Sequence, residues 1–234
     1  MNYILHRCND MTRLKQGLND PAINGLEIDF FIENGQVMIG HGGCDNKSNN
    51  RLTIHDLRNF YQDAEKILVV DLKDHDALIA WNLEDSIQIL AVLHQTLPER
   101  LPFFVTGLVT NWNALVRQTI NTWNVRHVTY FVDPINLHAC QHNFQALGIR
   151  FGLNLGTTVL PRFLGYLAVP LGLRASEKTK EFGTVAVVCS VGAFLFEAIT
   201  WALADVRMIW TITSSAQEEA LKGLNADYLI IEPF

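Results

Sequence analysis

The chain has 234 residues, of which 49% are hydrophobic and only 18% are charged. This composition excludes a disordered chain, and the length is close to the roughly 250 residues of one eight-stranded βα barrel. The net charge of −6 and the lack of a basic run argue against nucleic acid as the main partner and leave small molecules or lipids.

Short apolar runs rich in β-branched residues alternate with helix-like segments, the pattern of βα units around a parallel sheet. In chain order the candidate strands are Asn2–His6, Leu26–Phe31, Lys66–Leu72, Phe103–Thr106, Val128–Val132, Arg150–Leu155, Val185–Ser190, Arg207–Ile212 and Tyr228–Ile231. The turn signal Glu33-Asn34-Gly35 predicts that Gln36–Gly40 forms a hairpin with the second strand. The helix-like segments are Thr53–Ala64, which begins at a capping Thr53, Leu83–Leu97, Asn111–Thr122, Leu137–Leu147 and Ala216–Leu224.

These elements predict an α/β protein with one (β/α)8 TIM-type barrel that occupies residues 1–234 as a single domain. The nine candidate strands exceed by one the eight that such a barrel needs. One of the apolar runs between Val128 and Ser190 is therefore not a barrel strand, and the sequence leaves open which.

Polar side chains gather at the carboxyl ends of the first three predicted strands, where TIM barrels place catalytic groups. Glu27 and Asp29 share one face of their strand because strand side chains alternate, and Asp71 and Lys73 share a face in the same way. The full set is His6, Arg7, Glu27, Asp29, His41, Asp71 and Lys73.

This set suits chemistry at a phosphodiester, which gains negative charge in its transition state. Three carboxylates can hold one hard divalent cation, Mg²⁺ or Ca²⁺, and Lys73 adds a further positive charge. The histidines His6 and His41 can deprotonate a nucleophile and protonate a leaving alkoxide.

The order and spacing of His6-Arg7, Glu27-x-Asp29, His41 and Asp71-x-Lys73 resemble those of the glycerophosphodiester phosphodiesterase family. The same barrel core occurs in the sphingomyelinase D-type phospholipases. Near the end of the chain, Ile209-Trp210-Thr211-Ile212 and Asn225-Ala226-Asp227-Tyr228-Leu229-Ile230 resemble the last two strands of the family. Residues 100 to 200 carry no matching motif.

The resemblance implies hydrolysis of glycerophosphodiesters to glycerol 3-phosphate and an alcohol, with one bound divalent cation. The implied roles are metal ligation by Glu27, Asp29 and Asp71, acid, base or nucleophile chemistry by His6 and His41, phosphate contact by Arg7 and Lys73, and a pocket wall at Trp210.

The sequence departs from the family pattern around both histidines. Cys8 follows Arg7 where the family has glycine, and the family's Pro-Glu-Asn-Thr element is missing. His41 is followed by Gly42-Gly43-Cys44, which resembles the sphingomyelinase D side. An alternative is therefore phospholipase D-like cleavage of lysophospholipid or sphingophospholipid diesters, with a cyclic phosphate when a substrate hydroxyl attacks. A non-catalytic barrel that only binds a metal is a further alternative.

Two apolar segments raise the question of a membrane. The nearly uncharged stretch Phe182–Val206 is interpreted as a buried strand followed by a covering helix, and no stable membrane span is expected. The apolar segment Leu160–Leu173 leaves peripheral contact with a lipid surface open.

The four cysteines form no C-x-x-C pair and no signal peptide is evident, so we expect reduced thiols and a cytoplasmic location. The sequence does not indicate an oligomeric state.

Overall fold

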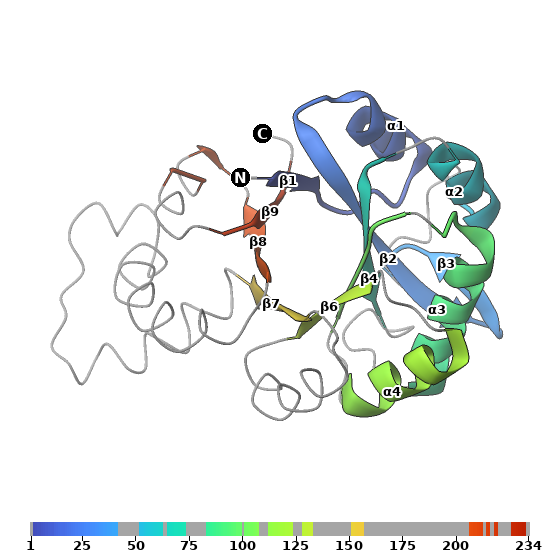
Figure 1. Cartoon of the computed structure of the whole chain (residues 1–234). Coiled ribbons are helices and arrows are strands. Elements are labelled where there is room, and N and C mark those ends of the chain that lie inside the picture. Colours follow the sequence, from blue (N-terminus) through green and yellow to red (C-terminus); the bar gives the residue numbers. More distant parts are fainter. Residues whose placement is uncertain are drawn as a thin grey trace, which may run out of the picture.

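A closed ring of parallel strands forms the centre of the computed structural model (Figure 1). The structure describes residues 2–41, 52–62, 65–73, 83–99, 101–107, 112–123, 128–132, 151–156, 206–212, 214–215, 218–219 and 226–232. The ring consists of β1 (Asn2–Leu5), β2 (Ile23–Glu33), β4 (Ile67–Leu72), β5 (Phe103–Gly107), β6 (Val128–Val132), β7 (Phe151–Gly156), β8 (Val206–Ile212) and β9 (Tyr228–Ile231). Strand β3 (Gln36–Ile39) pairs antiparallel with β2 as the predicted hairpin.

The ring closes because β1 pairs in parallel with β9 on one side and with β2 on the other. Each remaining neighbour in the order β2, β4, β5, β6, β7, β8, β9 also pairs in parallel. The predicted TIM-type barrel is therefore confirmed, and all eight ring strands overlap predicted strands. The surplus candidate Val185–Ser190 lies outside the described residues, and β7 pairs directly with β8, so the ring closes without it.

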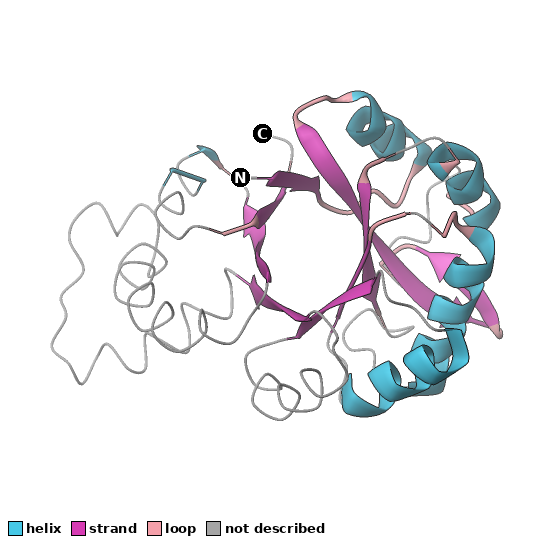
Figure 2. Ribbon diagram, in the orientation of Figure 1, coloured by secondary structure: helices cyan, strands magenta, loops and turns pink. Residues whose placement is uncertain are grey.

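Four helices of the described part of the chain lie outside the ring on the side of β2, β4 and β5 (Figure 2). They are α1 (Met11–Asn19), α2 (Ile54–Tyr61), α3 (Leu83–Thr96) and α4 (Trp112–Trp123). Thr53 caps α2 as expected, since its side chain accepts from the N–H of Asp56, whose carboxylate accepts from the N–H of Thr53. The predicted helix 137–147 lies outside the described residues, and of 216–224 only residues 218 and 219 are described, both helical.

Helix α1 lies between the first two strands and is not among the predicted helices. It has nine residues, and Met11, Leu14 and Leu18 recur at helical spacing and pack on the core, so the sequence carried an apolar pattern that was overlooked. Asp10 begins the helix by accepting hydrogen bonds from the N–H groups of Thr12 and Arg13. A Cβ at Gly17 would lie 2.3 Å from Leu26 Cδ2, so this glycine lets α1 pack closely on the ring.

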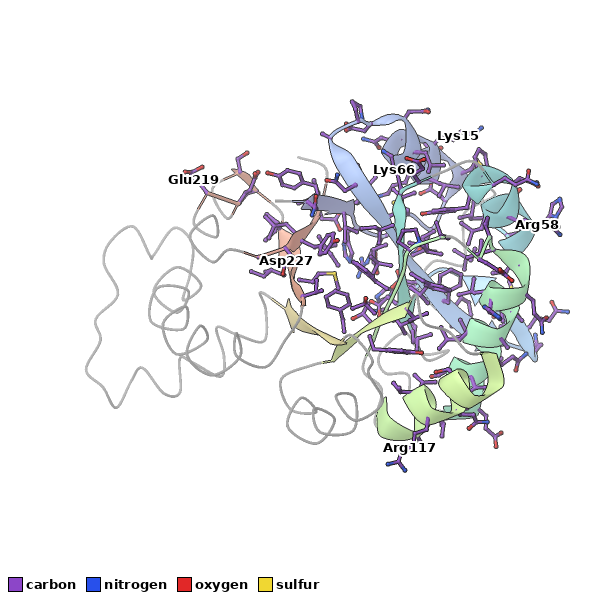
Figure 3. The ribbon with its side chains drawn as sticks, in the orientation of Figure 1. Lys15, Arg58, Lys66, Arg117, Glu219 and Asp227 are labelled. Atoms are coloured by element: carbon purple, nitrogen blue, oxygen red, sulfur yellow. The ribbon has the colours of Figure 1, made fainter. Side chains whose placement is uncertain are left out.

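The interior of the ring is apolar below its carboxyl-terminal mouth. Ile4, Val69, Phe104, Phe131, Val206, Met208 and Ile230 form one buried cluster contributed by six ring strands. The Phe104 ring lies 5.0 Å, centroid to centroid, from the rings of both Phe131 and Tyr228. Apolar side chains on the opposite faces of these strands fill the space toward the helices, whereas Arg58 and Arg117 project outward (Figure 3). The polar groups at the mouth therefore lie directly above a layer of apolar side chains, which we call the floor of the barrel.

Gly107 ends β5 next to the mouth, in a conformation that few other residues adopt. Its φ is +136°, and a Cβ there would lie 2.7 Å from the Leu72 carbonyl oxygen. We predict that Gly107→Ala lowers the free energy of unfolding by about 2–4 kcal/mol, because both strain and a backbone clash arise. Gly35→Ala is the matched control, since Gly35 has φ +74° with open space around it, and should cost about 1 kcal/mol. Equal losses in urea unfolding would contradict the steric explanation.

Candidate active site

The mouth of the barrel contains a gap in the pairing of β2. Along one edge of β2, β1 pairs with residues 23 to 26 and β3 pairs with residues 30 to 33. Between them, the backbone groups of β2 form hydrogen bonds with residues outside β1 and β3. Glu27 O accepts from Cys8 N at 2.7 Å, and Asp29 O accepts from Gly40 N at 3.0 Å. The Asn9 side chain completes the set by accepting from Asp29 N at 2.9 Å. The residues that follow β1 and β3 are thus brought directly against Glu27 and Asp29.

Three buried carboxylates meet inside the mouth. Asp29 on β2 lies level with Asp71 on β4, and Glu27 lies two residues earlier on the same face of β2. Their exposed fractions are 1% for Glu27, 1% for Asp29 and 4% for Asp71. One oxygen from each carboxylate lies within 4.8 Å of the others.

Lys73 follows β4 and places its ammonium group beside this cluster. Its Nζ donates to Asp71 Oδ2 at 2.6 Å and lies 3.5 Å from Asp29 Oδ1. Burial alone would lower the pKa of Lys73, but the neighbouring carboxylates, Asp71 first, outweigh it and raise the pKa above its ordinary value. The lysine is therefore charged at neutral pH.

One ammonium group does not balance three carboxylates. Burial, with added repulsion from Asp29, raises the pKa of Glu27 well above its ordinary value. Burial also raises the pKa of Asp71, although Lys73 opposes the shift. Asp29 Oδ1 is buried and accepts no hydrogen bond. Hard oxygen donors with surplus negative charge and an unused acceptor fit a divalent cation, so Glu27, Asp29 and Asp71 could hold one.

His6 follows β1 and is 5% exposed. Its Nδ1 lies 2.6 Å from Glu232 Oε1, and its Nε2 faces the carboxylates, 3.8 Å from Glu27 Oε2. Burial lowers the pKa of His6 despite the opposing effect of Glu232. Burial would raise the pKa of Glu232, but hydrogen bonds to Arg13 and His6 outweigh it and lower the pKa. At neutral pH a neutral imidazole thus lies against an ionised carboxylate.

Arg7 connects the two sides of the gap. Its φ is +51°, a conformation rare for residues other than glycine, and its backbone N–H donates to Glu27 Oε2 at 2.5 Å. Its guanidinium Nη2 lies 3.2 Å from His41 Nε2. Because guanidinium can only donate, His41 Nε2 is the acceptor. Gly40 precedes this histidine with φ +140° and turns the chain into the mouth.

The structure thus gathers His6, Arg7, Glu27, Asp29, His41, Asp71 and Lys73 around the mouth. The backbone of Trp210 lies in β8, but its side chain is outside the described residues. The sequence analysis missed Asn9, whose Nδ2 donates to Asp29 Oδ2 at 2.7 Å, and also Glu232. Glu232 could have been found, because it directly follows the last predicted strand and so obeys the same strand-end rule.

The raised pKa of Glu27 predicts how stability depends on pH. The folded protein binds this proton more tightly than the unfolded chain, so without metal the free energy of unfolding falls as the pH rises above the ordinary value of 4.5. Each unit of pKa difference is worth about 1.4 kcal/mol. Glu27→Gln should remove this contribution. The free energy of unfolding of the variant should therefore rise relative to that of the unchanged protein between pH 5 and 7.5.

Urea unfolding in chelator at several pH values measures this difference. Glu33→Gln, at the far end of β2, is the control and should run parallel to the unchanged protein. Parallel curves for Glu27→Gln as well would refute the raised pKa.

Comparison with known proteins gives likenesses in structure alone. No protein-family model and no curated protein sequence matches the chain. A phosphodiesterase from Oleispira antarctica, solved in complex with its product sn-glycerol-3-phosphate, superposes with a TM-score of 0.59 at 15% identity, covering 99% of this chain and 92% of that one. A glycerophosphodiester phosphodiesterase from Parabacteroides distasonis gives a TM-score of 0.57 at 12% identity, with coverage of 99% and 92%. The chain therefore has the barrel fold of these phosphodiesterases over nearly its whole length.

Proposed function

We propose that the chain is a metal-dependent phosphodiesterase of the glycerophosphodiester phosphodiesterase family, which hydrolyses glycerophosphodiesters to glycerol 3-phosphate and an alcohol. The observation that carries the proposal is the cluster of Glu27, Asp29 and Asp71 within 4.8 Å at the mouth of the barrel, with His6 beside it. The fold shared with a phosphodiesterase that binds sn-glycerol-3-phosphate supports the same substrate class. On this proposal the 234 residues act as one catalytic domain.

The three carboxylates would hold one Mg²⁺ or Ca²⁺ ion, because both prefer oxygen ligands. When bound, the cation would stabilise the negative charge that develops on the phosphoryl oxygens. Lys73 would contribute further positive charge beside it, and Asn9 would orient Asp29 through its two hydrogen bonds to that residue.

His6 is suited to take a proton. Its Nδ1 side is occupied by Glu232, and its neutral state leaves Nε2 with a lone pair toward the cluster. In hydrolysis, water would give a proton to Nε2 as a new P–O bond forms. The P–O bond to the alcohol then breaks, and His41, once it has left Arg7 and taken up a proton at Nε2 from solvent, would protonate the departing alkoxide.

Arg7 and His41 form a pair that substrate would rearrange. The Arg7 side chain is exposed, so its guanidinium can leave His41 Nε2 and bind a phosphoryl oxygen. That movement would release His41 for proton transfer.

We also propose that Trp210 lines the substrate pocket, as the family resemblance implies. We further propose that the protein acts in the cytoplasm.

A phospholipase D-like reaction is the second candidate, and the Gly42-Gly43-Cys44 sequence after His41 is the observation that favours it. In this reaction a hydroxyl of the lysophospholipid or sphingophospholipid attacks the phosphorus, and the product is a cyclic phosphate. Among the described residues no helix is long and apolar enough to cross a bilayer. Of the two apolar segments considered above in relation to a membrane, residues 160–173 and residues 182–205 lie outside the described residues.

The acid and base roles predict large losses on substitution. His6→Ala and His41→Ala should each lower kcat for glycerophosphocholine by about 10²–10⁴-fold. His55→Ala, on the exposed face of α2, is the matched control and should leave kcat unchanged. Phosphorus NMR follows the reaction and separates glycerol 3-phosphate from a cyclic phosphate. Unchanged turnover in both site variants would refute the assignment, and a protein inactive on every diester tested would favour the non-catalytic barrel.

The carboxylate cluster predicts that activity depends on a divalent cation. Chelator should abolish turnover, and Mg²⁺ or Ca²⁺ should restore it. Asp71→Asn should weaken the cation affinity measured by calorimetry by at least about 10–100-fold, because it removes one of three charged ligands. Glu33→Gln should bind the cation as the unchanged protein does. Full activity in chelator would contradict metal dependence.

A further inference from the structure

Three side chains from separate elements form a continuous chain behind the cluster. Arg13 on α1 donates through Nη2 to Glu232 Oε2 at 2.5 Å, and Glu232 Oε1 lies 2.6 Å from His6 Nδ1. The side chains are only partly exposed, at 24% for Arg13 and 29% for Glu232, while that of His6 is 7% exposed. This series of side-chain contacts runs from Arg13 on the first helix, through Glu232 after β9, to His6 after β1.

The chemistry of Glu232 determines where the His6 proton lies. An ionised carboxylate has no proton to donate, so in the bond of 2.6 Å the proton must sit on His6 Nδ1. A neutral imidazole then has its lone pair on Nε2, the atom that lies 3.8 Å from Glu27 Oε2. A charged acceptor at Nδ1 also stabilises the imidazolium that forms when Nε2 takes a proton.

Helix α1 is held firmly enough to fix Arg13. Asp10 caps its first turn, and the close contact of Gly17 with Leu26 seats it against β2. At the other end, Lys66 Nζ donates to the carbonyl oxygens of Gly17 and Asp20 at 2.6 and 2.5 Å, and Lys66 lies beside α1 in Figure 3. The helix that carries Arg13 is therefore fixed in place, and the Arg13 guanidinium is held by Glu232.

We propose that Glu232 and Arg13 are positioning residues: Glu232 fixes the tautomer and orientation of His6 for proton transfer at Nε2, and Arg13 fixes Glu232. The role rests on the proposed phosphodiesterase activity. Neither residue touches the reacting atoms, and both act through the imidazole.

A purely structural role is the competing explanation, because Glu232 also holds β1 next to β9. The chain offers a matched control for it. Tyr3 on β1 donates through its hydroxyl to Glu218 Oε1 at 2.6 Å, another short carboxylate contact to a β1 side chain. Glu218→Gln removes a carboxylate from that contact without altering the histidine.

The test compares Glu232→Gln, Arg13→Gln and Glu218→Gln in the full chain. Glu232→Gln should lower kcat for glycerophosphocholine by about 10–100-fold while KM and Mg²⁺ affinity change by less than about twofold. Arg13→Gln should lower kcat by a smaller factor, and Glu218→Gln should leave it unchanged. Equal kcat losses in Glu232→Gln and Glu218→Gln, or a loss that follows only a lower melting temperature, would overturn the positioning role.

The His6 tautomer gives a readout that needs no activity. Nitrogen-15 NMR of the histidine-labelled protein, assigned with His6→Ala, should show His6 protonated at Nδ1 and not at Nε2 at pH 8. Glu232→Gln should shift the population toward the Nε2-protonated tautomer, because an amide can donate to Nδ1. Finding this tautomer in a protein that hydrolyses no diester would refute the phosphodiesterase and leave the His6–Glu232 geometry intact. An unchanged tautomer in Glu232→Gln would refute the positioning role in an active enzyme.

Discussion

The pairing of β1 on both of its edges is the constraint on which the site depends. Leu5 lies opposite the residue before Glu27 on one side and the residue before Glu232 on the other. His6, the next residue, therefore emerges between two carboxylates, one in the cluster and one behind it. Because β1 ends there, the edge of β2 is open where Glu27 and Asp29 stand, and the following loop supplies the hydrogen bonds that a strand would have made. The pairings of β1 that close the ring are therefore also the pairings that bring the site residues together.

The site has an energetic cost that its surroundings increase. Glu27, Asp29 and Asp71 stand on a floor of apolar side chains, where charge is poorly solvated and repulsion between carboxylates is strong. Lys73 offsets part of that repulsion. A cluster optimised for stability would carry fewer charges, and buried titratable groups with shifted pKa values concentrate at functional sites. The low dielectric of the same apolar floor would also strengthen the attraction between the carboxylates and a cation.

Much of this arrangement could be predicted because it follows from local periodicity. The eight ring strands are short β-branched runs, and alternation along β2 places Glu27 and Asp29 on one face. Helix α1 could have been predicted from its capping Asp10 and the apolar stripe Met11, Leu14 and Leu18, although Gly17 within it weakens the helical signal. Glu232 follows the end of a predicted strand and was overlooked, whereas Asn9 escaped because its role depends on which strands become neighbours in the ring. The surplus strand candidate could not be resolved from sequence for the same reason, since only the direct pairing of β7 with β8 shows that it is not needed.

The β2–β3 hairpin lets the position of His41 vary independently of the carboxylate cluster. Glu33 pairs with Gln36 across the tight Asn34-Gly35 turn, in which both central residues have positive φ, and Gln88 on α3 donates to Gly35 O at 2.7 Å. The number of residues in this turn sets the register of β3 and hence how far His41 reaches into the mouth. Insertions or deletions there would displace one histidine and leave β4 and the floor untouched. A change of length in this single turn would therefore move His41 relative to Glu27, Asp29 and Asp71, which keep their places on β2 and β4.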